Sequence, residues 1–371
     1  MRSFDVPTRM RFAIALPLAA IALAAGPVAH HWSQVASMKQ GRSFHTLTAL
    51  PDGRVLAVGG HPVQGTHMTA EVFDPLSGRW TYTTPAIRQH TQHRAVLLDD
   101  GRVAVIGGEV APRSIELYDA AVNRWTEAGV LLDKRFDHTA TKLQDGRVLV
   151  VGGWDTAASK PLASAEIFDP RAIATVRTGS LAIARDWHEA VLLPGGEVLV
   201  AGGESTAAVL SSAEIYDVAH ETWRATASMG DARTKFGMTV VGGAARPVVL
   251  AAGGRGVGGR FAVATAETWD PAACAWSRVA DMNVARTEFP MVALGDGTVL
   301  VAGGEDNEVF FDGVERFDAA RGAWTVLPAS IPERGAELAM VLMADGRVLV
   351  SGGTHNDHYN GSSNVAAVLR P

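Results

Sequence analysis

The sequence predicts an all-β fold, a seven-bladed β-propeller in which seven four-stranded sheets close into a ring. Three observations lead to it: aliphatic strands that end on two glycines, a repeated acid–aromatic–tryptophan pattern, and complementary incomplete units at the two chain ends. Units of 45 to 51 residues cannot bury their apolar faces alone and must stack on their neighbours. The glycine pairs are Gly59-Gly60, Gly107-Gly108, Gly152-Gly153, Gly202-Gly203, Gly253-Gly254, Gly303-Gly304 and Gly352-Gly353.

Length and charge narrow the classes of function. The chain has 371 residues, which a length rule divides into about two domains, but stacked repeats predict one closed domain over residues 30–371. The formal net charge is −6, whereas binding to a nucleic-acid backbone needs a basic surface. We therefore expect no nucleic-acid partner, and we expect a monomer.

Residues 1–29 are predicted to be a signal peptide. Arginines precede an apolar stretch, residues 12–25, which is too short to span a membrane. We place cleavage after Ala29, with an uncleaved anchor as the alternative. The protein is therefore expected to be periplasmic or secreted, without a membrane span. Cys274 is the only cysteine, so no intrachain disulfide forms, which is compatible with export when the core is large.

The first complete unit illustrates the four strands expected in each blade. Strand a covers residues 43–50, strand b residues 54–60 and strand c residues 69–74, and Trp80 lies on strand d. Most units carry an Asp-Gly pair between strands a and b, which predicts a two-residue type I′ turn because both residues tolerate positive φ. The fifth unit has residues 242–247 in this place and should have a longer turn.

Strand c carries a glutamate, an aromatic residue and an aspartate, as in Glu71-Val-Phe73-Asp74. The pattern recurs in six units, and a tryptophan follows seven residues after the aromatic in all but the third, which has Thr175. Together with the glycine pairs, this pattern resembles the kelch repeat, and the resemblance covers the chain from about residue 30 onward. It implies a propeller in which the loops d–a and b–c lie on one face beside a central channel.

The two chain ends predict how the ring closes. The last unit has strands a, b and c at residues 338–343, 347–353 and 365–369 and then stops. Residues 30–38, which include Trp32, resemble a strand d without the rest of its unit. Pairing the two segments leaves no free sheet edge, which would otherwise invite aggregation. We expect the N-terminal strand to complete the seventh blade.

Two series of polar residues fall on the loops that the resemblance places at the channel. One precedes strand a, and the other follows the glycine pairs. Arginines mixed with carboxylates suit a polyhydroxylated ligand, with Trp154 or Trp187 as a stacking face, or an acidic peptide. The candidate ligand-binding residues are Arg42, Arg135, Arg185, Arg233 and Arg286 from the first series, and Glu109, Trp154, Asp155, Glu204 and Glu305 from the second.

The repeated positions also have a structural interpretation. The arginines, and the four histidines that follow them by three residues, could tie blades together through backbone carbonyls or strand-c carboxylates. The residues after the glycine pairs vary between units and are the stronger candidates for binding. The glutamate of strand c recurs in six units and is expected to be structural. The histidines are His45, His93, His138 and His188.

No metal site and no cofactor are expected. The four histidines lie on separate blades, too far apart to share an ion with bonds of about 2 Å. His355 and His358 stand in a short segment of ligand-type residues, which we interpret as a polar surface loop with a turn at Asn360-Gly361.

Three functions remain open. We favour a non-catalytic recognition module that binds a glycan or a protein, since varied loops on a regular scaffold carry function. Similarity to periplasmic sialic acid mutarotases implies a second function, the isomerisation of a sugar. In that reaction Glu204, or else Glu109 or Glu305, would act as the acid/base group. Arg185 or Arg233 would bind the anionic group of the sugar.

The third function, oxidation, is implied by the similarity of residues 342–353 to the central domain of galactose oxidase. That family needs two tyrosines and two histidines as copper ligands, one pair adjacent as Tyr-His, and a Cys–Tyr crosslink. The chain contains no Tyr-His pair, and Cys274 is expected beside an outer strand. The copper chemistry is therefore not expected to carry over.

Overall fold

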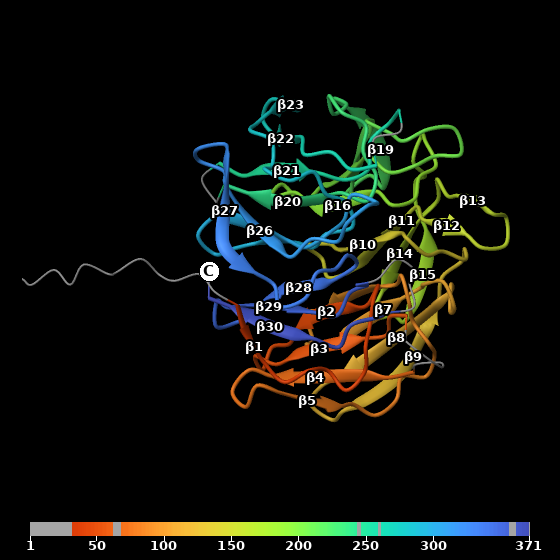
Figure 1. Ribbon diagram of the computed structural model, residues 1–371. Helices are drawn as coiled ribbons and strands as arrows, with labels where there is room; N and C mark the ends of the chain where they lie inside the picture. Colours follow the sequence, from red (N-terminus) through yellow and green to blue (C-terminus); the bar gives the residue numbers. More distant parts are fainter. Residues whose placement is uncertain (1–31, 62–67, 243–245, 259–260, 356–360, 371) are drawn as a thin grey trace, which may run out of the picture.

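The computed structural model describes residues 32–61, 68–242, 246–258, 261–355 and 361–370. Within these residues, seven antiparallel four-stranded sheets surround a central axis (Figure 1). The innermost strand of each sheet contacts the innermost strands of both neighbouring sheets. The sheets therefore form a closed ring, and the predicted seven-bladed propeller is confirmed. None of the described residues forms a helix long and apolar enough to cross a membrane.

Some predictions lie outside the described residues. These are the signal peptide at residues 1–29, the first two residues of the closing segment, and His358 with the turn at Asn360-Gly361.

Each blade follows the predicted order a, b, c, d from the axis outward. The innermost strands are β2 (Thr46–Ala49), β6 (Arg94–Leu97), β10 (Thr139–Lys142), β16 (Glu189–Leu192), β20 (Gly237–Val241), β24 (Met291–Ala293) and β28 (Ala339–Leu342). The second strands are β3 (Val55–Val58), β7 (Val103–Ile106), β11 (Val148–Val151), β17 (Val198–Ala201), β21 (Val248–Ala252), β25 (Thr298–Ala302) and β29 (Val348–Ser351). The third strands are β4 (Ala70–Asp74), β8 (Ser114–Asp119), β14 (Ala165–Asp169), β18 (Ala213–Asp217), β22 (Ala266–Asp270), β26 (Gly313–Asp318) and β30 (Ala366–Leu369). The outermost strands are β5 (Arg79–Tyr82), β9 (Arg124–Val130), β15 (Ala174–Arg177), β19 (Thr222–Thr226), β23 (Ala275–Arg278), β27 (Ala323–Ser330) and β1 (Trp32–Gln34). A small hairpin of β12 (Trp154–Asp155) and β13 (Lys160–Pro161) extends the third blade.

The core lies between adjacent blades. The second strand β11 is buried at every position, because neighbouring sheets cover both of its faces, and its valines suit such a strand. Aromatic residues of strand c pack on the tryptophan of strand d, as Phe73 does on Trp80 with ring centroids 5.1 Å apart. Thr175 pairs with Phe168 in the third blade, where the sequence lacks the tryptophan.

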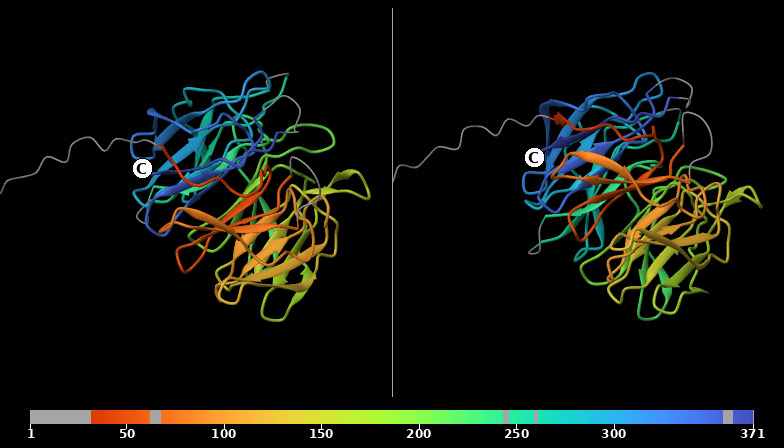
Figure 2. Two further views of the ribbon diagram at one scale, coloured as in Figure 1. Left: turned by 60° about the horizontal axis from the view of Figure 1, so that its bottom comes forward. Right: turned by 90° about the horizontal axis from the view of Figure 1, so that it is seen from below.

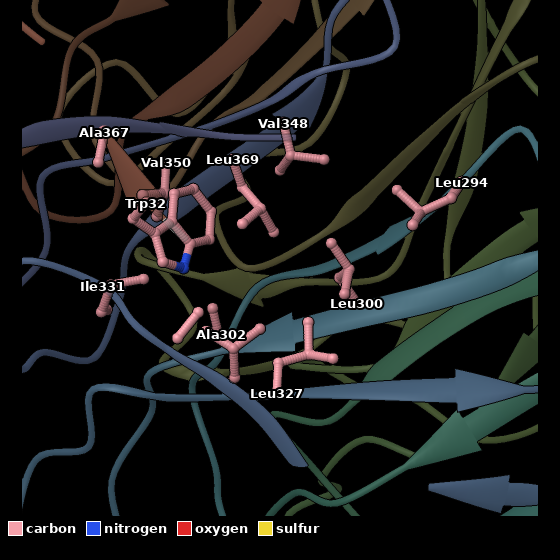
Figure 3. Packing of buried hydrophobic residues seen from close by; sticks show 12 residues of the cluster. Trp32, Leu294, Leu300, Ala302, Leu327, Ile331, Val348, Val350, Ala367 and Leu369 are labelled. Atoms are coloured by element: carbon pink, nitrogen blue, oxygen red, sulfur yellow. The ribbon is translucent and has the colours of Figure 1, made fainter. Parts of the chain in front are cut away.

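The N-terminal strand closes the ring as predicted. Trp32 pairs with Leu369 and Gln34 with Ala367 in antiparallel register, and Figure 2 shows β1 in red among the blue C-terminal strands. The indole of Trp32 packs among side chains of the sixth and seventh blades, including Ile331 and Val350 (Figure 3). The seam is therefore sealed by side-chain packing as well as by backbone pairing.

The prediction of two-residue type I′ turns is wrong. In the first blade the N–H of Leu50 donates to the C=O of Arg54, and the N–H of Gly53 donates to the C=O of Leu50. Only Gly53 has positive φ, at 87°, and Asp52 instead accepts from the N–H of Arg54 through its carboxylate. In the six blades other than the fifth, the turn is a three-residue loop with a glycine in the left-handed region. The fifth blade, where Val241 pairs with Val248, has the longer turn expected.

The second glycine of each pair is required by close contact with the loop before strand a of the same blade. Gly153 has a φ of +92°, and a Cβ there would lie 2.5 Å from the carbonyl oxygen of Phe136. Gly53 in the outer turn has a φ of +87° but nothing within 4 Å of such a Cβ. We expect Gly153→Ala to reduce the free energy of unfolding by about 2–4 kcal/mol, and Gly53→Ala by about 1–2 kcal/mol.

Urea unfolding of the two variants measures this difference. Equal losses would mean that Gly153 is required for its dihedral angles alone and that its contact with the loop before strand a is not tight.

Candidate functional site

The five candidate arginines lie beneath the channel face with buried side chains. Arg135 is representative: its Nη1 donates to the carbonyls of Gly152 at 2.6 Å and Ser164 at 3.1 Å, and its Nη2 donates to Glu166 at 2.6 Å. Both charged side chains are 0% exposed. The partners are backbone carbonyls and a strand-c carboxylate, as in the structural interpretation, but they lie within one blade and do not tie two blades together. Ligand binding by the arginines stays an untested prediction. The equivalent pairs are Arg42–Glu71, Arg185–Glu214, Arg233–Glu267 and Arg286–Glu315.

The strand-c glutamates hold the loops that enter each blade, as expected of a structural residue. Glu166 accepts from the N–H of Leu132 at 2.6 Å and from that of Asp133 at 3.0 Å. In the second blade His90 takes the place of the arginine, with its Nε2 3.0 Å from Glu116.

Three of the repeated histidines join neighbouring blades. His93 Nε2 lies 2.9 Å from Thr46 Oγ1, and His188 Nε2 lies 3.0 Å from Thr139 Oγ1. His45 Nε2 likewise lies 3.0 Å from Ser351 Oγ, between the first and seventh blades. Burial lowers the pKa of His45 to about 3, so the ring is neutral at physiological pH. The histidines therefore serve the structural role considered for them.

The residues after the glycine pairs form an outer ring around the channel mouth. Trp154, Glu204 and Glu305 each make a backbone bridge to the loop before strand a of their own blade, and the N–H of Glu109 donates to the C=O of Thr91 in the same place. Asp155 accepts from the N–H of Ala157 at 2.7 Å within its own hairpin. None of the five candidates is among the described residues that line the central cavity.

An inner ring that sequence reasoning did not single out surrounds the channel mouth. Each member lies two residues after the buried arginine or its equivalent and has a positive φ between 48° and 58°. The N–H of each member donates to the C=O of the member in the preceding blade at 2.9–3.4 Å, so the hydrogen bonds close a circle. The inner ring consists of Phe44, Gln92, Asp137, Trp187, Lys235, Glu288 and Glu337.

The inner ring holds side chains in a backbone conformation that disfavours them. A non-glycine residue in the left-handed region costs about 1–2 kcal/mol, and glycine would avoid this cost. Positions of this kind gather at functional sites, where the surrounding structure holds them. The ring backbone is the same in every blade, whereas its side chains are aromatic, amide, acidic and basic. The constant part is a scaffold, and the variable part gives the channel mouth its specific chemistry.

All inner-ring residues line one cavity of about 180 Å³ on the channel axis. Phe44 and Trp187, which come from blades three apart, approach across the channel with ring centroids 6.0 Å from each other. Residues of the innermost strands, including Arg94 and Glu189, line the cavity below them. Sites for drug-sized ligands measure about 300–1,000 Å³, so this cavity can hold only a ligand, or a part of a ligand, that is smaller than those.

Neighbouring blades contribute a pair of buried carboxyl groups. The Glu288 side chain is 4% exposed and Glu337 is 7% exposed. Lys235 forms an ion pair with Glu288, and its Nζ lies 4.4 Å from the centre of the Trp187 ring. Thr354 Oγ1 donates to Glu337 Oε2 at 2.8 Å. Among the described residues, Glu288 Oε2 and Glu337 Oε1 accept no hydrogen bond from another donor.

Glu337 is therefore protonated at neutral pH. Burial, the adjacent charge of Glu288 and a hydrogen bond between the two carboxyl groups raise the pKa of Glu337 to about 9. If both groups were ionised, two buried anions would face each other without a donor between them. One proton on the pair removes this conflict, while Lys235 neutralises Glu288.

Arg94 provides a positive charge deeper in the channel. Its guanidinium has no hydrogen bond or ion pair to other described residues. Burial raises the pKa of Asp137 well above its usual value and that of Glu189 to about 7, and the charge of Arg94 opposes both shifts. The channel thus contains several carboxyl groups whose charge is incompletely compensated.

A pattern in the repeats could have located the inner ring. Its members stand between the repeated arginine and the repeated histidine, and six residue types occupy the seven positions. The variable position lies between two repeated positions, and its variation distinguishes it from them.

The comparisons with known proteins agree with this architecture. The kelch motif family matches residues 143–172 and 190–230. Kelch repeat-containing protein kel-10 of Caenorhabditis elegans is 30% identical over 121 residues, which cover 32% of this chain and 20% of that protein. A kelch repeat and BTB domain-containing protein of the same organism matches with the same identity and coverage. The matched region thus spans about one fifth of each relative.

A solved fungal alcohol oxidase of the AA5 family, in complex with copper, is similar in structure. Its TM-score is 0.74 at 18% sequence identity, and the match covers 92% of this chain and 76% of that one. At this identity the likeness is one of fold.

The described residues do not fit a copper site of that kind. The cavity is lined by no tyrosine and no cysteine among the described residues. Tyr118 and Tyr216 occupy the strand-c core position, and Cys274 is exposed next to β23. In the described part of the chain, no three His, Cys, Asp or Glu side chains are grouped to hold a metal ion.

Proposed function

This chain is a kelch-repeat β-propeller, and we propose that it is a recognition module that binds a sugar residue of a glycan in the inner-ring cavity. One observation carries the proposal. Side chains of six types stand at the seven positions of one repeated, strained backbone ring and line one cavity. Function resides in variable residues that a rigid scaffold positions.

The chemistry of the inner ring supports a sugar as the ligand. Trp187 and Phe44 offer apolar ring faces, while Gln92, Glu288 and Glu337 offer donors and acceptors beside them. Small-ligand sites combine apolar surface with a few placed polar groups in this way. A volume of about 180 Å³ suits one sugar residue better than a folded protein surface. The signal peptide predicted at residues 1–29 supports, as part of the same proposal, an encounter with the ligand outside the cytoplasm.

Replacement of Trp187 tests the proposal. Trp187→Ala is expected to weaken binding of the preferred sugar by about tenfold or more, because buried aromatic anchors dominate binding energy. Isothermal titration calorimetry measures the affinity of both proteins for the methyl glycosides of glucose, galactose, glucosamine and N-acetylglucosamine.

Tyr82→Ala is the matched control, since Tyr82 is an exposed aromatic residue on the outer strand β5. It should bind as the wild type does. Equal affinity of the wild type and Trp187→Ala for every sugar bound would overturn the assignment of the cavity.

Anomer exchange is a second candidate, favoured by the raised pKa of Glu337 next to the carboxyl group of Glu288. Glu288 would accept the proton of the anomeric hydroxyl while Glu337 protonates the ring oxygen, so that the C–O bond of the ring breaks and re-forms on either face. These residues differ from the expected Glu204 with Arg185 or Arg233. An NMR time course of sialic acid or galactose mutarotation tests this candidate. If the protein does not accelerate mutarotation, anomer exchange is eliminated and recognition remains as the proposed function.

A further inference from the structure

We infer that the inner-ring cavity binds the ammonium group of its ligand, between Glu337 and the ring faces of Phe44 and Trp187, so that the preferred sugar is an amino sugar. This inference rests on the proposed function and specifies the chemical class of its ligand.

The distribution of charge around the cavity favours a cation. The carboxyl groups near it outnumber the two basic groups, Lys235 and Arg94. Four of the acids lie in the cavity wall: Asp137, Glu189, Glu288 and Glu337. A fifth, Glu305, belongs to the outer ring and lies near Glu288. Burial raises the pKa of Asp137, Glu189, Glu305 and Glu337. Protons thus compensate for charge that the protein's own cations leave unbalanced, and an organic cation can replace one of them.

The inner ring already contains one ammonium site. The Nζ of Lys235 lies over the indole of Trp187 at 4.4 Å and pairs with Glu288, an arrangement that stabilises a partly desolvated cation. The other half of the carboxyl pair has no such cation. Glu337 is 93% buried, given its 7% exposure, and its Oε1 receives no hydrogen bond from another donor.

Glu337 lies in the wall of the space that a ligand would fill. Glu288, Phe44 and Trp187 line the same cavity, so a group that enters can contact both the carboxyl pair and the aromatic rings. An ammonium group donates three hydrogen bonds and is small enough for this volume. A neutral hydroxyl could bond to Glu337 but could not replace the charge of its proton.

Binding of a cation must expel the proton of Glu337. The groups that act on Glu337 are Glu288, Lys235 and Thr354, and Asp137 and Arg94 line the same cavity. Because the pKa of Glu337 is about 9 before binding, the group is protonated at pH 6.5. A bound ammonium lowers that pKa, so about one proton leaves for each ligand bound.

Calorimetry at pH 6.5, in two buffers of different ionisation enthalpy, tests the inference with methyl glucosaminide and methyl glucoside. The glucosaminide is expected to bind about tenfold or more tightly than the glucoside and to release about one proton. Glu337→Gln should remove the proton release and lower affinity for the glucosaminide about tenfold, with glucoside affinity within about twofold. Glu127→Gln, an exposed change on β9, is the matched control.

The outcomes separate the two proposals. Equal affinity for the two glycosides without proton release overturns the ammonium site but keeps sugar recognition. Binding of the amide of Nα-acetyl-lysine, with proton release and without binding of either glycoside, supports the ammonium site and overturns the glycan. Failure of all three compounds to bind overturns both proposals.

Discussion

Removal of residues 32–38 is expected to lower the free energy of unfolding by about 4 kcal/mol or more. Truncation of a buried tryptophan alone costs about 3–5 kcal/mol, and Trp32 is 9% exposed within the cluster that joins the sixth and seventh blades. The deletion also removes the β1–β30 ladder and leaves β30 as an open edge, which favours aggregation. Urea unfolding and size-exclusion chromatography measure both effects.

A synthetic peptide of residues 30–39 provides the control. Added in trans, it should restore stability, because an extended peptide can add a strand to a free edge, whereas the same peptide with Trp32→Ala should not. Unchanged stability of the truncated chain would contradict closure of the ring by this strand.

Arg135→Met is expected to lower the free energy of unfolding by about 3–5 kcal/mol, because it leaves the buried carboxylate of Glu166 without its cation. The arginine joins the loop before strand a to the end of strand b and to strand c, so its loss affects three segments at once. Urea unfolding followed by tryptophan fluorescence measures the change.

Arg177→Met is the matched control within the same blade. Arg177 is 53% exposed and binds Asp133 at 2.7 Å, and exposed ion pairs contribute about 0–1 kcal/mol. If the two variants lose equal stability, the buried arginines are not structural, and their role as ligand contacts gains support.

The architecture could be predicted from the sequence because repetition reveals it. A residue type that recurs at a fixed interval, such as Glu166 in strand c or Gly153 after strand b, marks a contact that every blade must make. The incomplete unit around Trp32 indicated the seam for the same reason. The turn type could not be predicted, because Asp-Gly occurs both in type I′ turns and in three-residue loops.

The candidate site was predicted only in part. The repeated residues include Arg135, which joins segments of its own blade, and His188, which joins two neighbouring blades. The loop face and Trp187 were identified, but the dihedral angles that make Trp187 a member of the inner ring are not visible in sequence. The raised pKa of Glu337 depends on burial and on Glu288, 49 residues away in the chain, and no local pattern indicates such a pair.

Fluorine NMR of the protein labelled with 5-fluorotryptophan tests the central claim, that ligand enters the inner ring. The chain has nine tryptophans, and of those in the described residues Trp187 lines the cavity. On titration with methyl glucosaminide we expect one resonance to shift, and Trp187→Phe should identify it. A resonance of another tryptophan that shifts instead, or calorimetric binding with no change at Trp187, would contradict the account.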